Sequence, residues 1–345
     1  MTASSSVLFV FLLFNPIIFN ANPNQMYRRI FALAIKKPTR FNRPIIRNIN
    51  SKMVKDTDTP SCRGGGCSTT EDTHRQTIME GYGSIAENKE KSCCGSNKKD
   101  VTKEDYAKGL GYSAEDLKGL PEGANMGLSC GNPTAMASLQ PGQTVLDLGS
   151  GGGFDVFVAA RKVGPTGKSL GVDMTPAMVH KARSNAVQFA EHNPSLANVC
   201  DFRMGEIEHL PVADASVDVV ISNCVINLSP DKAQVWKEIA RVLKPGGKAC
   251  ISDIVLLQPL PEQVKSSVSA LIGCVAGAIE IDEVVKLVEA VGMTVAQADK
   301  DAAFVHNAES SDDPLYKNLM KELPEGTKPG DLVTSLKLTA TKPNN

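Results

Sequence analysis

Residues 143–257 alternate between short apolar runs and longer segments with helical periodicity. Each apolar run suits one buried strand, and each longer segment places its apolar residues on one face of a helix. Strands and helices alternating at this spacing predict an α/β fold, a doubly wound and mostly parallel sheet with helices on both faces. The expected strands are 144–148, 169–172, 198–204, 217–222 and 248–257, and the expected helices are 154–163, one from 176 onward, and 232–243.

Turn and capping residues mark several of these boundaries. Thr175 precedes Pro176, so we expect an N-cap followed by proline at the first helical position. The Lys-Pro-Gly-Gly run at 244–247 is expected to stop the helix before it. Farther upstream, residues 106–120 predict one or two short helices, with Ser113 as an N-cap and Pro121 ending the second.

The pattern weakens on both sides of this core and predicts four parts. Residues 1–55 form a basic leader, 56–125 a cysteine-bearing N-terminal arm, 126–257 the main domain, and 258–345 a small α+β C-terminal extension. Residues 56–100 have no sustained hydrophobic period, which predicts a flexible or loosely docked segment. The extension is expected to hold helices at 261–274 and 282–291 and weaker strands at 294–297 and 332–339.

The leader contains no acidic residue but nine Lys or Arg between Arg28 and Lys55. Its apolar run at 7–19 is short for a membrane span and lacks a basic region before it, so stable membrane insertion is not expected. The composition at 26–37 is typical of an organelle presequence. Translation from Met53 is the other possibility. The expected location is cytoplasmic, with a mitochondrial or other organellar location as the alternative.

Composition excludes some functions. The chain has 37 basic and 38 acidic residues and only 5% aromatic residues, so neither charge nor base stacking favours nucleic-acid binding. The nine cysteines are odd in number and spread along the chain, unlike a secreted disulfide framework. We expect a monomer.

A glycine loop, Asp147-Leu-Gly-Ser-Gly-Gly-Gly-Phe-Asp155, follows the first expected strand. Glycines let the backbone approach a ligand at the start of a helix. The dinucleotide pattern would require glycine at the position of Phe154, so that reading is disfavoured. The spacing instead resembles the first motif of S-adenosylmethionine-dependent methyltransferases.

The ends of the next two strands supply further cofactor candidates. Asp173 lies about 20 residues beyond the loop, where a ribose diol is expected. The segment at 205–208 follows the third strand and suits the adenine ring. The expected cofactor-binding residues are Asp147, Gly149, Ser150, Gly151, Gly153, Asp173, Met174, Gly205, Glu206, Ile207 and Asn223.

Cysteines occupy two kinds of position. Cys200 and Cys250 lie on or beside expected strands and suit small buried apolar residues. Cys224 lies where a strand runs out into a loop, the end at which α/β sheets bind ligands. Cys130 and Cys274 lie in glycine-rich surroundings far away in sequence. The sequence contains no C-x-x-C pair, so a structural zinc site is not expected.

Together these motifs resemble the arsenite methyltransferases, most closely the microbial members, over residues 78–295. The resemblance is carried by Ser129-Cys-Gly-Asn-Pro133, the glycine loop, Gly171–Pro176, Ser222–Lys232, Leu243–Gly247, Ser252-Asp253 and Gly273–Gly277. The glycine loop and Leu-Lys-Pro-Gly-Gly are common among methyltransferases, whereas the surroundings of the three cysteines are far more specific.

The resemblance implies a Rossmann-like class I methyltransferase fold with a seven-stranded sheet. It implies that Cys130, Cys224 and Cys274 bind trivalent arsenic as thiolates and that S-adenosylmethionine donates the methyl group. Soft arsenic prefers sulfur, and because its lone pair is the nucleophile, no general base is needed. Activity should rise with pH as the thiols ionise. The resemblance also implies a redox-active cysteine at Cys93 or Cys94, and thioredoxin or glutathione as reductant.

Two other functions stay open. A quinone, sterol or other small-molecule methyltransferase would share the glycine loop but would not need Cys130 and Cys274. A thiol-based metalloid-binding protein would not need an intact glycine loop. Cys62 and Cys67 have no counterpart in the resemblance, and exposed thiols are the expected interpretation.

Overall fold

The computed structural model describes residues 70–87, 102–267, 270, 274–301, 323 and 326–344. All of these residues belong to one unit, residues 65–345. The predicted leader and the cysteines Cys62, Cys67, Cys93 and Cys94 lie outside the described residues. None of the helices in the described ranges combines the length and apolar content that crossing a membrane requires.

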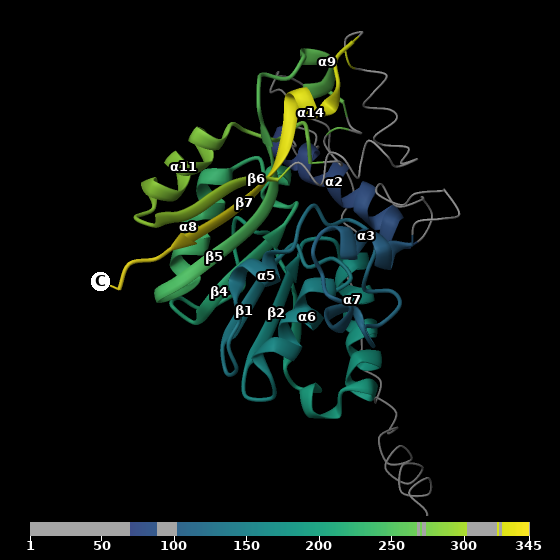
Figure 1. The fold of residues 1–345 in the computed structure, drawn as a ribbon. Coiled ribbons are helices and arrows are strands. Elements are labelled where there is room, and N and C mark those ends of the chain that lie inside the picture. Colours follow the sequence, from purple (N-terminus) through teal and green to yellow (C-terminus); the bar gives the residue numbers. More distant parts are fainter. Residues whose placement is uncertain are drawn as a thin grey trace, which may run out of the picture. The chain divides into compact units, whose positions relative to one another are not determined.

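A seven-stranded sheet forms the centre of the fold, with the strand order β3-β2-β1-β4-β5-β7-β6 (Figure 1). Strands β1 to β5 run parallel, while β7 is antiparallel to both β5 and β6. The strands are β1 Thr144–Leu148, β2 Lys168–Asp173, β3 Cys200–Met204, β4 Val217–Asn223, β5 Leu243–Leu256, β6 Thr294–Asp301 and β7 Val333–Thr341. The predicted α/β fold class and the seven-stranded sheet are confirmed.

Helices cover both faces of the sheet. The longer helices are α2 Thr70–Ala86, α6 Phe154–Val163, α7 Pro176–His192, α8 Lys232–Val242 and α11 Ile281–Ala290. The shorter ones are α3 Lys103–Gly109, α4 Ala114–Leu117, α5 Pro133–Ala137, α9 Glu262–Lys265, α14 Pro329–Leu332, and the 3-10 turns η3 Pro194–Leu196 and η4 Ile226–Leu228. Alternate residues of β1 show why two layers form. Leu146 packs into the core with α8, whereas Val145 packs into the core with α6 and α7.

The strand order reverses between β1 and β4. The chain runs outward from β1 through β2 to β3, and then returns to place β4 on the other side of β1. In open α/β sheets the crevice at such a switch point, beyond the carboxyl ends of the strands, is where ligands bind. The end of β1 leads into Gly149 and the end of β4 into Cys224, so the glycine loop and a cysteine meet at this crevice.

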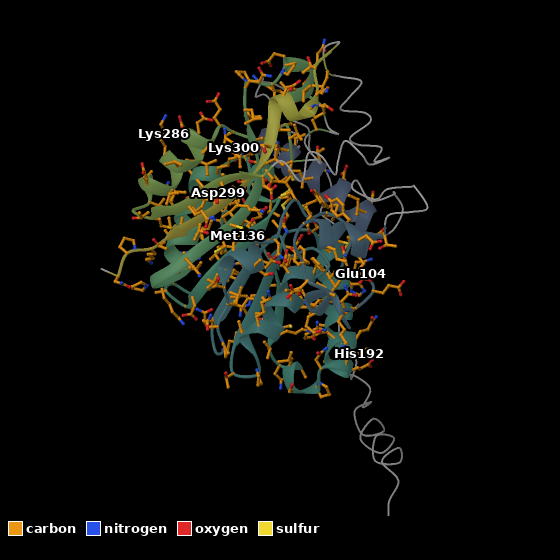
Figure 2. All side chains as sticks on the ribbon, in the orientation of Figure 1. Glu104, Met136, His192, Lys286, Asp299 and Lys300 are labelled. Carbon is orange, nitrogen blue, oxygen red and sulfur yellow. A yellow bond between two sulfur atoms is a disulfide. The ribbon has the colours of Figure 1, made fainter. Side chains whose placement is uncertain are left out.

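Strands β6 and β7 join the main sheet instead of forming a sheet of their own. The charged residues of β6 are explained by its position: Asp299 and Lys300 lie exposed on this edge strand of the sheet (Figure 2). Charged side chains on an edge strand disfavour pairing with another chain. The domain boundaries inferred above, at 125/126 and 257/258, stay a prediction.

Three local predictions need correction. Residues 70–86 of the segment expected to be flexible form α2, where Ile78, Tyr82 and Ile85 provide a single apolar stripe. The helix expected at 261–274 is not continuous: α9 ends at Lys265, and Ser266 and Ser267 are not helical. The Ser266 hydroxyl donates back to the carbonyl of Glu262, a contact that competes with helical hydrogen bonding.

The third correction concerns Thr175. Thr175 occupies the N-cap position of α7, as expected, but its side chain makes no capping hydrogen bond. By contrast, Ser113 caps α4 with a reciprocal capping box to Asp116, as predicted.

Candidate active site

The glycine loop joins β1 to α6 in a conformation that needs glycine. Gly149, Gly151 and Gly153 have φ values of 66°, 50° and 93°, which are strained for other residues. A Cβ on Gly149 would lie 2.4 Å from Cγ2 of Val225, so a side chain there would collide with the loop after β4. The loop therefore keeps its backbone close to the crevice.

Asp173 ties this loop to the end of β2. Its carboxylate accepts hydrogen bonds from the backbone N–H groups of Gly151 (2.9 Å) and Thr175 (2.8 Å). Burial raises the pKa of Asp173, against the lowering effect of these two donors. Asp173 thus lines the site, as predicted, and also holds the two loops together.

Asp147 is a buried carboxylate beside that loop. It is only 4% exposed, and no described residue donates a hydrogen bond to it. Burial, followed by the charges of Asp155 and Asp173, raises its pKa well above the usual range. A buried acid without a partner is costly, so a ligand carrying positive charge would be stabilised here. The amino and sulfonium groups of S-adenosylmethionine fit this requirement.

Two pockets meet at the crevice and share Tyr82, Gly149 and Asp173 in their walls. The first is lined by Asp147, Ser150, Gly151, Asn223 and Cys224, among others. The second is lined by Met174, Gly205, Ile207 and Glu208, together with apolar residues of η4. The predicted cofactor residues therefore line these two pockets, with two exceptions. Gly153, the N-cap of α6, and Glu206 line neither pocket.

Glu206 faces helix α2 instead of a pocket. Its carboxylate lies 3.5 Å from Nε of Arg75, and the same guanidinium lies 3.6 Å from Glu208. Glu208 is buried and accepts a hydrogen bond from the hydroxyl of Ser229 (2.6 Å). The acid that reaches the pocket after β3 is therefore Glu208, two residues beyond the one predicted.

Helix α2 supplies three pocket residues that the sequence interpretation missed. Arg75, Ile78 and Tyr82 line the second pocket, and Tyr82 lines the first as well. His74 further docks the helix, with Nε2 lying 2.9 Å from the carbonyl of Leu228. The spacing of Ile78, Tyr82 and Ile85 is helical, but three apolar residues in a polar segment are a faint signal.

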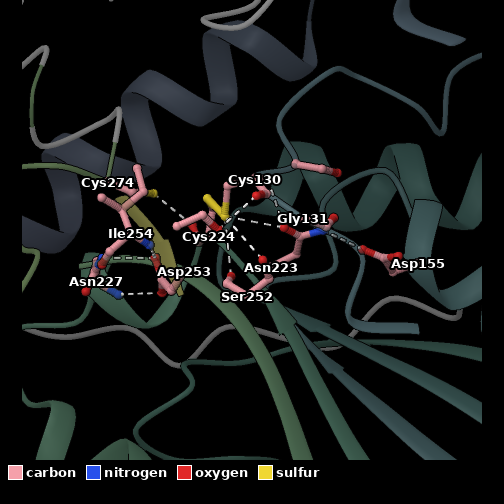
Figure 3. Close-up of a disulfide and its surroundings, with 12 residues drawn as sticks. Cys130, Gly131, Asp155, Asn223, Cys224, Asn227, Ser252, Asp253, Ile254 and Cys274 are labelled. Atoms are coloured by element: carbon pink, nitrogen blue, oxygen red, sulfur yellow. Dashed lines mark hydrogen bonds between the residues drawn. A yellow bond between two sulfur atoms is a disulfide. The ribbon is translucent and has the colours of Figure 1, made fainter. Parts of the chain in front are cut away.

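The three cysteines at the crevice lie in one cluster (Figure 3). Cys130 and Cys224 form a disulfide, and Sγ of Cys274 donates to the carbonyl of Cys224 (2.8 Å). Cys224 and Cys274 both have positive φ, 56° and 62°. Such backbone strain in non-glycine residues is typical of functional sites. Among the described residues no set of three or more His, Cys, Asp and Glu is arranged to hold a metal ion, so the three-thiolate arsenic site stays a prediction.

Tyr82 and Lys232 both interact with Cys274. Oη of Tyr82 lies 3.9 Å from its Sγ. The ammonium group of Lys232, which hydrogen-bonds the carbonyl of Ser229 (3.0 Å), interacts electrostatically with the same cysteine. Tyr82 thus contacts a cysteine and both pockets, so α2 connects the two halves of the site.

Cys250 lies in the core of the sheet, as predicted, and Cys200 lies on β3, partly buried against that core. Cys250 is fully buried among apolar residues of the sheet, and Cys200 packs against the same cluster. Burial raises the pKa of the Cys200 thiol to about 12 and also raises that of Cys250. Neither thiol ionises at neutral pH.

Comparison with known proteins agrees with this site. Residues 139–292 match a family described as "Methyltransferase domain". An arsenite methyltransferase from Halobacterium salinarum is 41% identical over 295 residues, covering 82% of this chain and 70% of that protein. The resemblance to microbial members is therefore confirmed.

Two solved structures are similar to this chain. An arsenic(III) S-adenosylmethionine methyltransferase from Chlamydomonas reinhardtii is 33% identical, with 69% of this chain and 73% of that chain covered and a TM-score of 0.48. The [4+2]-cyclase SpnF, at 15% identity, covers 80% of this chain and 97% of its own with a TM-score of 0.52, which shows a shared fold alone. From the identity and coverage of the Halobacterium relative, the chain belongs to the arsenite methyltransferase family.

Proposed function

We propose that this protein is an S-adenosylmethionine-dependent arsenite methyltransferase that methylates trivalent arsenic held by Cys130, Cys224 and Cys274. The observation that carries the proposal is the placement of Cys224. It belongs to the cysteine cluster and also lines the pocket that contains the glycine loop and Asp147. A methyl donor in that pocket and a metalloid on that cysteine would be neighbours, and positioning of the two reactants is a large part of catalysis.

The pocket residues have separate parts in binding the donor. Asp147 would face its positive charge, Asp173 its ribose, and Ile207 and Met174 its adenine ring. When bound, S-adenosylmethionine supplies an electrophilic methyl group on a sulfonium. Tyr82 and Ile78 of α2 would cover the donor and exclude water.

Arsenic is the proposed substrate because the site is built from sulfur. Trivalent arsenic is soft and prefers thiolates to oxygen ligands. Held in this way, it keeps a lone pair, so the site needs no general base. An oxygen-directed methyltransferase would have no use for three clustered cysteines, and the cluster disfavours that alternative.

The disulfide implies a reductive step before arsenic can bind. Cys130 and Cys224 must gain two electrons and two protons to become thiols, while an external dithiol or two molecules of a monothiol are oxidised to a disulfide. A thioredoxin- or glutathione-type reductant is therefore the proposed co-substrate.

The test is an assay of the full chain with arsenite, S-adenosylmethionine and a thiol reductant, with arsenic species separated by chromatography and measured by elemental detection. We expect methylated arsenicals, and only when the reductant is present. Protein that binds S-adenosylmethionine and has reduced cysteines, yet forms no methylated arsenic, would contradict the proposal.

A further inference from the structure

Asn223 is the last residue of β4, immediately before Cys224, and its side-chain amide is hydrogen-bonded to other parts of the protein. Its Nδ2 donates hydrogen bonds to the carbonyl of Gly131 (2.9 Å) and to Oδ2 of Asp155 (3.1 Å). Its Oδ1 accepts from the backbone N–H of Cys130 (3.0 Å). Both ends of the amide are thus occupied by the protein, although Asn223 borders the cofactor pocket (Figure 3).

The direction of this amide is set by two buried neighbours. The Tyr112 hydroxyl donates to Oδ1 of Asp155 (2.6 Å), and its oxygen lies 3.2 Å from Nδ2 of Asn223. Tyr112 is 2% exposed and Asp155 is 5% exposed. Because the carbonyl of Gly131 can only accept a hydrogen bond and the N–H of Cys130 can only donate one, the NH₂ end of Asn223 must face Gly131 and Asp155, and its oxygen must face Cys130.

The hydrogen bond from the Cys130 N–H to Asn223 lies directly beside the Cys130–Cys224 pair. Asn223 ends β4 and Cys224 follows it, so this bond holds the backbone of Cys130 against the residue that precedes Cys224. The Cα atoms of the two cysteines lie 5.9 Å apart. On its other side, Cys130 is held by Ser335 of β7, whose hydroxyl donates to the Cys130 carbonyl (3.1 Å).

We propose that Asn223 is a positioning residue that holds Cys130 against Cys224, with Asp155 and Tyr112 orienting its amide, and that it is not a cofactor ligand. The inference deepens the proposed function, because the pair it positions are two of the three proposed arsenic ligands. It concerns the geometry of the pair, however, and that geometry can be measured without arsenic.

The first measurement is the thiol–disulfide equilibrium of the full chain in glutathione buffers. Oxidised glutathione takes two electrons from Cys130 and Cys224, which form their disulfide while two molecules of reduced glutathione are released. The equilibrium constant reports how well the two thiols are held together. We expect Asn223→Ala to lower it by about tenfold or more, equivalent to about 1.4 kcal/mol. Tyr112→Phe, a milder change, should lower it by about two- to fivefold.

Controls separate positioning from general damage. Asn193→Ala removes a comparable side-chain hydrogen bond at the end of α7, far from the cysteines, and should leave the equilibrium unchanged. S-adenosylmethionine affinity, measured by calorimetry, should change by less than about twofold in both site variants. If Asn223→Ala fails to fold, Tyr112→Phe carries the same measurement.

An exchange of the two side chains gives a sharper test. Asn223→Asp places a carboxylate against Asp155 and should weaken the pairing of the cysteines more than alanine does. Adding Asp155→Asn restores a donor facing an acceptor at this contact, while the Gly131 carbonyl still faces the new carboxylate, so we expect the double variant to recover part of the equilibrium constant relative to Asn223→Asp alone. No recovery would overturn the orienting role of Asp155.

The decisive contrary result is an Asn223→Ala variant that loses S-adenosylmethionine affinity by about tenfold while its cysteine pair is unaffected. That result would make Asn223 a cofactor ligand. Failure of the proposed function is distinguishable, because wild-type protein that forms no methylated arsenic would still show whether Asn223 controls the equilibrium.

Discussion

Cys250 in the sheet interior and Cys224 at the crevice are buried to a similar degree but lie in different surroundings. Cys250 is fully buried and Cys224 is 9% exposed, so burial does not separate them. Cys250 sits within a strand among apolar side chains, and its Sγ lies 4.0 Å from the Thr339 hydroxyl. Cys224 lies just beyond a strand, with positive φ and a pocket beside it. Position relative to the end of a parallel strand, not burial, therefore distinguishes a chemically useful thiol.

The pair Cys224→Ser and Cys250→Ser tests this comparison most directly. We expect Cys224→Ser to reduce arsenite methylation by more than about a hundredfold, because it removes a proposed ligand and not merely a supporting contact. S-adenosylmethionine affinity should stay near that of the wild type, as measured by calorimetry. If folded Cys250→Ser protein lost as much methylation activity as Cys224→Ser, the distinction between sheet cysteines and crevice cysteines would be wrong.

Cys274→Ser is expected to have the next largest effect. Cys130 and Cys224 would still hold arsenic as a dithiolate, so arsenite affinity should fall by about tenfold rather than disappear. Titration of the reduced protein with arsenite measures this change. Binding unchanged from the wild type would exclude Cys274 from the ligand set.

Tyr82→Phe should have a smaller effect. It removes a weak contact with the Cys274 sulfur and keeps the ring that lines both pockets. A lost hydrogen bond of about 1 kcal/mol corresponds to about a fivefold lower arsenite affinity. Tyr106→Phe, which removes a hydroxyl that donates to the Ser129 carbonyl, is the matched control. A change in S-adenosylmethionine affinity alone would assign Tyr82 to the cofactor.

The smallest functional effects are expected for the strand cysteines. Cys250→Ser buries a hydroxyl in an apolar core and should cost about 1–3 kcal/mol of unfolding free energy. Cys200→Ser should cost less than about 1 kcal/mol, since Cys200 is only partly buried. Urea denaturation measures both changes. Arsenite affinity should be unaffected, and a loss in either folded variant would mean that thiol chemistry extends into the sheet.

The core of the fold could be predicted because its signals are local. The apolar run of β1 and the helix α6 were located at their observed residues, 144–148 and 154–163. Cys224 could be placed at a strand end from the length of one apolar run. The meeting of this end with the glycine loop then follows from general rules of parallel sheets.

Features that depend on tertiary contacts could not be predicted. Helix α2 is polar apart from a short stripe, and its position depends on contacts such as that of Arg75 with Glu206 and Glu208. The same ion pairs hold Glu206 against α2, a tertiary contact that its position in the sequence does not reveal. The role of Asn223 was likewise hidden, because its partners lie 68 to 111 positions away in the sequence.

The insertion of β7 between β5 and β6 has a consequence for synthesis on the ribosome. β7 is the last of the described strands to be translated, yet it separates two strands made earlier. Until it emerges, β5 exposes an unpaired edge, and Ser335 is not yet present to hold the carbonyl of Cys130. A chain released before residue 333 would therefore lack both the strand that pairs with β5 and the hydroxyl that holds the carbonyl of Cys130. The surroundings of the cysteine cluster are completed only once β7 has been translated. Prematurely terminated chains are therefore incomplete at the proposed arsenic site itself.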